Sequence, residues 1–304
     1  MKIMPLAPLL LILGSILGTA CAPKVAPAIE MATVNAEHAS LRAKGSATSR
    51  TLKVLDPGAM VEILEQQGRW YRVRLGDTEG WMDNSTLLTT TMRKHIQELA
   101  DSSRNQISQN TGTLGQDSNL RVEPGRSTAV LRRLPARTAL EVLEHRTVSR
   151  EDLPGRIDSW LKVRTSPTEV GWLLSGFVEF DVPAGIAPYT EDFIYSAVKT
   201  LNTVEDPVAG PVSWYVVGER RPGTDPTLDF VGIRVFTWNA KKQRYETAFR
   251  KQGLRGVYPL EVNRVAGNPT FRFYELSADG KTKAPREFVM TGVIVRETKK
   301  KESK

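Results

Sequence analysis

Residues 68–82 read GRWYRVRLGDTEGWM, and this stretch decides the fold of the first half of the chain. Tyr71 and Val73 alternate with Trp70 and Arg72, which puts the two pairs on opposite faces of an extended segment. Such a period of two residues is typical of a half-buried strand. A Gly-Asp turn follows, and a second strand that ends in Gly-Trp resumes the sheet. The stretch therefore predicts a β-hairpin with one buried face.

The hairpin pattern occurs a second time. Trp160 and Lys162 repeat Trp70 and Arg72 ninety positions later, and a Gly-Trp pair follows again. Such a recurrence predicts two structurally related domains in tandem.

Upstream of each hairpin the two copies stay in step. The segment VEILE at residues 61–65 matches LEVLE at residues 140–144, with an offset of 79 positions. The second copy therefore carries eleven extra residues before its hairpin. Residues 146–159 are charged and contain Pro-Gly, and insertions into loops cost little stability. We therefore expect a lengthened loop at residues 146–159.

Each copy shows an early Leu-Arg pair, the VEILE-type strand, the Trp-x-x-Val strand and the late Gly-Trp, in that order. With these motifs, each copy resembles a bacterial SH3-like domain. The resemblance implies two small, strongly bent antiparallel barrels that bind cell-wall peptides, glycans or proteins. The second copy departs from the pattern in its long loop and in Leu161, which replaces Tyr71 of the first copy.

The alternation also indicates a ligand surface on each barrel. With Val73 facing inward, Trp70 and Arg72 lie on the outer face, and Trp160 and Lys162 repeat this arrangement. An exposed indole beside a cation can stack on a sugar or peptide and bind a carboxylate. The resemblance agrees, because a Trp at this strand start lines the ligand groove in SH3-like domains. The alternative is that these tryptophans pack beneath a neighbouring loop or against the next barrel.

The N-terminus has the features of an export signal. Residues 1–20 combine a positively charged start, an apolar run and small residues before Cys21, the only cysteine of the chain. This arrangement resembles the lipobox of bacterial lipoproteins, which implies that Cys21 carries lipid. Ordinary cleavage that leaves a free thiol is the alternative. Ala22 follows the cysteine, which resembles the signal for the periplasmic face of the outer membrane if the host is diderm.

The remaining sequence completes a mainly β organisation of two SH3-like barrels in tandem and a C-terminal antiparallel β-sheet domain with one helix. Apolar residues at helical spacing predict a connector helix between the barrels, and Thr190 as an N-cap predicts a helix over about twelve residues in the third region. The expected boundaries are a signal peptide at 1–20, a tether at 21–31, barrels at 32–91 and 112–182, a linker at 92–111, a β-rich domain at 183–298 and a disordered tail at 299–304.

The residue inventory restricts the chemistry. The chain has three histidines, His38, His95 and His145, and none follows residue 183. A Ser-His triad, a Cys-His nucleophile or a zinc site therefore cannot be assembled within the third region. Asp225 and Asp229 could form a carboxylate pair, but acids in such Pro- and Gly-rich segments are usually solvated turn formers. We expect no metal, no cofactor and no enzymatic activity.

The formal charge of +8 favours an anionic polymer as partner, while the export signal argues against nucleic acid. The sequence therefore predicts a non-catalytic, lipid-anchored protein of the cell envelope that binds peptidoglycan or an envelope protein. A structural spacer inside an envelope assembly is the alternative, and a carboxylate-dependent wall hydrolase is a third possibility. An exposed groove at Trp70 would favour the binding module, and tryptophans buried between domains would favour the spacer.

Overall fold

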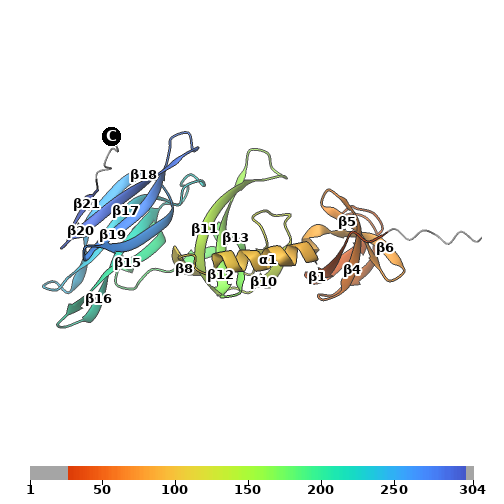
Figure 1. The fold of residues 1–304 in the computed structure, drawn as a ribbon, viewed down its shortest axis with the longest axis horizontal. Helices are drawn as coiled ribbons and strands as arrows, with labels where there is room; N and C mark the ends of the chain where they lie inside the picture. Colours follow the sequence, from red (N-terminus) through yellow and green to blue (C-terminus); the bar gives the residue numbers. More distant parts are fainter. Residues whose placement is uncertain (1–26, 299–304) are drawn as a thin grey trace, which may run out of the picture.

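The computed structural model describes residues 27–298, which form three seven-stranded antiparallel sheets arranged in a row (Figure 1). Cys21, the signal peptide and the tail at 299–304 lie outside the described residues. The mainly β prediction is confirmed. The first strand begins at Glu30, inside the tether expected at 21–31, and it pairs with the strand that begins at Met60. No helix in the described part of the chain is both long and apolar enough to span a membrane.

The first sheet has the strand order β3-β2-β6-β5-β4-β1-β7. Its apolar side chains form one closed core, in which Leu41, Val73 and Met82 are fully buried. The bounds are β1 (Glu30–Val34), β2 (Ala39–Arg42), β3 (Thr51–Leu55), β4 (Met60–Gln67), β5 (Trp70–Leu75), β6 (Thr78–Asp83) and β7 (Leu87–Thr89).

The second sheet repeats this topology strand for strand, in the order β10-β9-β13-β12-β11-β8-β14. Leu120 and Val163 occupy the core positions of Leu41 and Val73, and all four side chains are fully buried. The bounds are β8 (Asn110–Leu114), β9 (Ser118–Arg121), β10 (Val130–Leu134), β11 (Ala139–Ser149), β12 (Ile157–Ser166), β13 (Glu169–Leu174) and β14 (Val178–Phe180).

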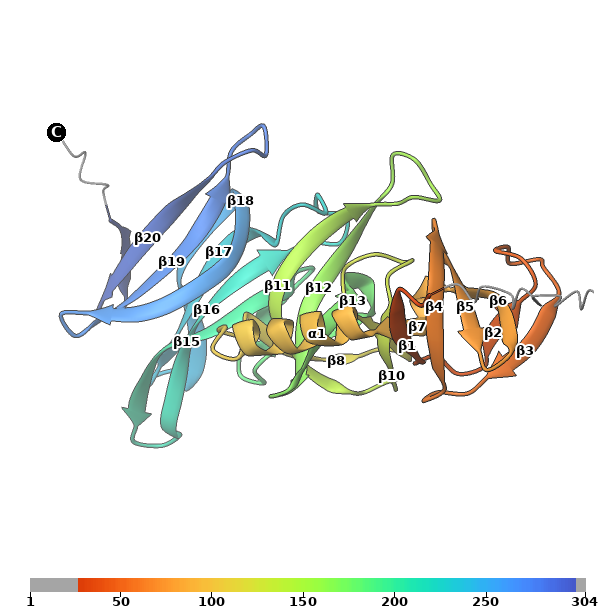
Figure 2. The ribbon, with the colours of Figure 1, turned by 45° about the vertical axis from the view of Figure 1, so that its right-hand side comes forward.

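The extra residues of the second copy lengthen both the strands and the loop, whereas the sequence suggested a loop over the whole of residues 146–159. β11 and β12 remain paired up to Ser149 and Ile157, so only residues 150–156 turn the chain. Figure 2 shows this hairpin as a long arm that projects from the second barrel. Charged and polar residues form the extension because its faces meet solvent and neighbouring domains, and this composition resembled that of a loop.

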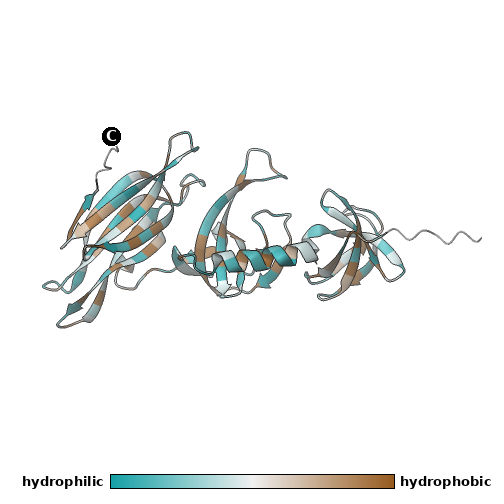
Figure 3. Ribbon diagram, in the orientation of Figure 1, coloured by the Kyte–Doolittle hydropathy of each residue, from teal (hydrophilic) through white to brown (hydrophobic). Residues whose placement is uncertain are grey.

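One α-helix, α1 (Thr90–Ser103), joins the two barrels, as the apolar spacing predicted. The Thr89 side chain caps the helix by accepting a hydrogen bond from the Met92 backbone N–H at 3.1 Å. The helix is polar over most of its surface (Figure 3), and its apolar residues Met92 and Ile96 pack on a small cluster between the barrels. The His95 side chain is half-exposed on the helix.

The third sheet runs in simple order from β15 to β21, and β17 lies inside it. Separate clusters that include Ile233 and Phe236 cover its two faces. The bounds are β15 (Ile194–Asp206), β16 (Gly210–Arg220), β17 (Phe230–Asn239), β18 (Arg244–Val265), β19 (Asn268–Leu276), β20 (Lys283–Thr291) and β21 (Ile294–Glu297).

The prediction of a helix after Thr190 is wrong, because residues 194–206 form the strand β15. Two β-bulges interrupt its pairing with β16, one after Tyr195 and one after Thr200. The side chains of Ala197 and Leu201 are both buried in the same core cluster, four positions apart. A separation of four positions puts two side chains on one face of a strand as well as of a helix, so this spacing did not distinguish the two.

The second barrel and the third sheet share a buried seam. Gln109, directly before β8, is 1% exposed, and its carbonyl accepts the Val198 N–H while its side chain accepts the Leu260 N–H at 2.7 Å. Tyr258 packs against the cores of both units. These contacts fix the extended β11–β12 hairpin relative to the third sheet.

Candidate functional site

In the first barrel, Trp70 and Arg72 do not form the open platform that the alternation suggested. Trp70 is half-buried and packs against the loop at Gly45, whose added Cβ would lie 3.1 Å from Trp70 Cγ. Arg72 is exposed, but its guanidinium donates to Glu79 Oε2 at 2.8 Å and lies 3.5 Å from Glu65 Oε2. The hydrogen bond to Glu79 raises the pKa of Arg72. The cation is thus neutralised locally by two carboxylates.

In the second barrel, the expectation that Trp160 and Lys162 face outward is wrong. Trp160 is 1% exposed and Lys162 is 7% exposed. Lys162 Nζ lies 2.6 Å from Glu144 Oε2 and 6.0 Å from the centre of the Trp172 ring. The long hairpin and the adjoining loops cover this face, so strand alternation alone misjudged its exposure.

The buried Trp160 side chain lies between two clefts. Two clefts, of about 310 and 250 Å³, meet at its ring and share the side chain of Arg126. The Trp160 indole N–H is buried and has no hydrogen-bond acceptor among the described residues. A buried donor without an acceptor is costly, so this position calls for an acceptor group from a ligand or solvent.

The larger of these two clefts also contains Arg121, a cation without an ion-pair partner within residues 27–298. Arg121 lies on β9 beside Trp160, and its guanidinium donates to the Thr128 carbonyl. Burial lowers the pKa of Arg121, which the carboxylate of Asp83 only partly offsets. No ion pair within residues 27–298 includes Arg121, whereas Arg126 and Arg133 are paired with Asp158 and Asp117. The cleft is therefore suited to an anionic group.

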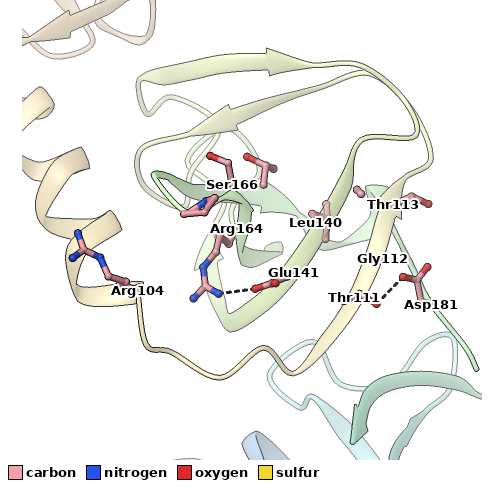
Figure 4. Close-up of a pocket in the computed structure, with 12 residues that line it drawn as sticks. Arg104, Thr111, Gly112, Thr113, Leu140, Glu141, Arg164, Ser166 and Asp181 are labelled. Carbon is pink, nitrogen blue, oxygen red and sulfur yellow. Dashed lines mark hydrogen bonds and ion pairs between the residues drawn. The ribbon is translucent and has the colours of Figure 1, made fainter.

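Another cleft, of about 650 Å³, lies elsewhere on the second barrel, beside the end of α1 (Figure 4). Arg164 Nη1 lies 2.6 Å from Glu141 Oε2, and the Thr111 hydroxyl donates to Asp181 Oδ2 at 2.6 Å. Figure 4 shows these two interactions as dashed lines. Arg164 Nε is buried without a hydrogen-bond partner, but the charge of this guanidinium is balanced by Glu141, unlike that of Arg121.

The acids of the third region separate into two kinds. Asp225 is a turn former, because its carboxylate accepts the Thr227 N–H at 2.9 Å. Asp229 is not, because it is 5% exposed and its Oδ1 lies 2.7 Å from His145 Nδ1. The sequence argument considered histidines inside the third region alone, and the fold supplies one from the second barrel. No signal in the local sequence connects positions 145 and 229.

Metal binding finds no support in the described part of the chain, where no group of three or more His, Cys, Asp or Glu side chains is arranged to hold an ion.

Comparison with known proteins places one domain firmly. Residues 37–87 match the family model of the bacterial SH3 domain, which corresponds to the first barrel. The second barrel shares its strand order. The curated proteins contain no match to this chain.

Solved structures similar to this chain include NlpC and NlpC/P60 proteins. NlpC2 from Trichomonas vaginalis shares 13% identity over 89% of this chain and 98% of its own, with a TM-score of 0.19. An NlpC/P60 endopeptidase from Photobacterium damselae subsp. piscicida shares 9% identity over 88% of this chain and 66% of its own, also with a TM-score of 0.19.

These neighbours contradict the expectation of a non-catalytic binding protein without enzymatic activity, and that expectation is not retained. Scores at this level do not themselves place a peptidase site on this chain. A catalytic site has to be argued from the side chains of the chain itself.

Proposed function

We propose that this chain binds an anionic component of the bacterial cell wall, namely a peptide that carries free carboxylates. The bacterial SH3 domain at residues 37–87 supports a role in cell-wall or protein binding. Binding of this kind is compatible with catalysis elsewhere in the chain. The second barrel has the same strand order, and we propose that it is a second SH3-like domain which contributes the binding cleft.

The observation that carries the proposal is a pair of groups in one cleft: the Arg121 guanidinium, which is in no ion pair within residues 27–298, and the Trp160 indole N–H, which has no acceptor there. A peptide carboxylate would bind the guanidinium, and a neighbouring peptide carbonyl would accept the indole N–H. Arg binds planar carboxylates with two parallel hydrogen bonds, which suits a chain terminus. Arg69 of the first barrel lines the adjoining cleft, so both barrels contribute to the same surface.

The experiment is a pull-down of the purified protein on peptidoglycan sacculi, followed by titration with a soluble muropeptide. Arg121→Gln removes a charged donor worth about 1.5–3 kcal/mol, so binding should weaken at least about tenfold. Trp160→Phe keeps the ring and removes the N–H, which should weaken binding about threefold to tenfold.

Two matched controls separate this site from general effects. Arg132→Gln changes an exposed arginine of β10 that is paired with Glu169 and does not line the cleft. Trp214→Phe removes another indole N–H that is buried without a partner, on β16 of the third sheet. Equal binding by Arg121→Gln and wild type, or equal losses in the controls, would show that the cleft is not the binding site.

Trp70→Ala tests the first barrel in the same assay. We propose that the exposed part of the Trp70 ring, beside the Arg69 guanidinium at 6.0 Å, contributes a stacking surface. Binding should fall while the barrel remains folded, and loss of the folded state would instead identify Trp70 as a packing residue.

Lipidation at Cys21 forms part of the proposal, because the segment before it resembles a lipobox. It would hold the barrels at a membrane surface, on the periplasmic face of the outer membrane in a diderm host. Cys21→Ser should release the protein from the membrane fraction. Recovery of unmodified wild-type protein in the soluble fraction would refute the anchor.

A further inference from the structure

Three side chains from two domains form a hydrogen-bonded line at the seam between the second barrel and the third sheet. Ser159 Oγ lies 2.8 Å from His145 Nε2, and His145 Nδ1 lies 2.7 Å from Asp229 Oδ1. The His145 and Asp229 side chains are 5% and 6% exposed, and Ser159 is half-buried. A serine hydroxyl, an imidazole and a carboxylate thus stand in the order that nucleophilic serine catalysis requires.

The extended hairpin explains why Ser159 and His145 meet. In the β11–β12 register Thr147 pairs with Ser159 and His145 pairs with Leu161. Ser159 and His145 are therefore diagonal neighbours on one face of the hairpin, within reach of each other's side chains. At the offsets of 79 and 90 positions, His145 and Ser159 correspond to Gln66 and Arg69 of the first barrel, so the residues that the second copy has gained lie between them. The first barrel has neither a histidine nor a serine at these two positions.

Asp229 is held in place before it meets the imidazole. Its backbone N–H donates to the Gly256 carbonyl at 2.9 Å, and its own carbonyl accepts the Ser196 hydroxyl at 2.7 Å. The Tyr258 backbone N–H donates to Asp229 Oδ2 at 2.6 Å. One carboxylate oxygen is therefore occupied by a rigid backbone donor, and Oδ1 is aimed at His145.

The carboxylate also determines the tautomer of His145. A carboxylate oxygen at 2.7 Å requires a donor, so Nδ1 carries the proton. Nε2 of the neutral ring is then an acceptor, and the Ser159 hydroxyl donates to it. This is the direction in which a general base withdraws the proton of a nucleophile.

Clefts open beside this line of residues. One of about 580 Å³ is lined by His145, Asp229 and Tyr258, and another of about 530 Å³ is lined by Leu161, Asp229 and Tyr258. Each has the size of a small-molecule site. The first is lined by Lys283 together with Glu144 and Glu261, and the second by Arg220 together with Glu179, so the charges lining the clefts are mixed. Ser159 itself stands beside these clefts, next to His145, and does not line them.

We propose that Ser159 is the nucleophile of a hydrolytic site for carboxylic esters, with His145 as general base and Asp229 as a positioning residue. Ser159 Oγ attacks the ester carbonyl carbon as its proton passes to His145 Nε2. The C–O bond to the alcohol breaks, and His145 returns the proton to the leaving alkoxide. Water then attacks the acyl-Ser159 ester, again with His145 as base, and releases the carboxylic acid and the free serine.

The same three residues could serve only to fasten the two domains together, and a chemical probe separates the two roles. A fastener does not react covalently, whereas an activated serine reacts with an electrophilic phosphonate. The full chain is treated with an alkyl fluorophosphonate that carries a reporter, and the labelled residue is identified by peptide mass spectrometry. Hydrolysis of p-nitrophenyl acetate is measured in parallel.

Wild-type protein should be labelled at Ser159, and Ser159→Ala should show neither the label nor the esterase rate. His145→Gln should lower the labelling rate by about 10²–10⁴-fold, because the general base is lost. Ser166→Ala changes an exposed serine at the far end of the same strand and should behave as wild type. Circular dichroism and thermal unfolding establish that each variant is folded.

The proposal is overturned if the folded wild-type protein is not labelled, or if the label lies on another residue. It is also overturned if Ser159→Ala hydrolyses the ester at the wild-type rate. Labelling of wild type does not depend on the stability of any variant, so an unfolded Ser159→Ala leaves that part of the test intact. Loss of wall binding in the cleft variants Arg121→Gln and Trp160→Phe, with labelling unchanged, would separate this site from the proposed binding function.

Discussion

Lys199 should make the third domain more stable at alkaline pH than at neutral pH. Its side chain lies in β15, at the seam with the second barrel, and burial lowers its pKa from the ordinary value of 10.5 to about 8. Nearby Glu141 and Glu261 oppose this shift without reversing it. The native state therefore carries a buried charge at pH 7 that the unfolded chain keeps in water.

The size of the effect follows from linkage. One pKa unit corresponds to about 1.4 kcal/mol, so a fall from 10.5 to about 8 corresponds to an upper limit of about 3 kcal/mol. The native state loses the Lys199 proton near pH 8 and the unfolded state near pH 10.5. Between these values the unfolded state binds more protons, so stability rises with pH across this window. Below pH 8 the penalty is fully present.

Replacement of Lys199 by Met keeps the length of the side chain and removes the charge. Urea unfolding of the two proteins at pH 7, 9 and 10 should show Lys199→Met more stable at pH 7, by up to about 3 kcal/mol, with the difference shrinking as pH rises. Lys241→Met, in the exposed turn after β17, serves as control and should show no such trend. A difference at pH 7 that is absent, or that stays constant to pH 10, would refute the reasoning.

Three further substitutions test the packing of the seam and the third sheet by urea unfolding. Gln109→Ala leaves the buried Leu260 N–H without an acceptor and should cost about 1–3 kcal/mol, and a loss below about 0.5 kcal/mol would contradict this role. Gly256→Ala should cost about 3 kcal/mol, because the added Cβ would overlap the fully buried Phe230 ring. Gly253→Ala meets no atom within 4 Å but has a φ of +73°, so it should cost about 1–2 kcal/mol from backbone strain, less than Gly256→Ala.

Strand alternation correctly predicted which side chains of the barrel strands face the core. Val73 and Val163 were placed in the core, and both are fully buried. The same rule put Trp160 on the surface. Alternation separates the two faces of a strand, but it does not show whether other parts of the chain bury the outer face. In the second barrel the long hairpin and its neighbouring loops supply that cover. The matching Trp70 lacks the hairpin extension and stays half-exposed.

The two incorrect element predictions have a common physical origin. In β15 a spacing of four between buried side chains suited a helix and a strand equally. In residues 146–159 the two ends are paired strand, although their composition is that of a loop. In both segments the backbone pairs with a neighbouring strand, and the pairing energy overrides the local pattern. A sequence pattern indicates which side chains of one element are buried, whereas the secondary structure of these two segments depends on the strands with which they pair.

The same limit of local sequence patterns applies to the hydrogen-bonded residues Ser159, His145 and Asp229, because they come from different parts of the chain. The argument against a serine nucleophile was sound for each domain alone, since the third region has no histidine. It failed because the site is assembled across a seam, where the docking contacts of Gln109 and Tyr258 set the distance between positions 145 and 229. The hairpin extension distinguishes the second barrel from the first, and it lies between the two residues that the second barrel contributes to this line. The local sequence around positions 145, 159 and 229 does not indicate a shared site, because the three side chains meet only when the second barrel and the third sheet are docked.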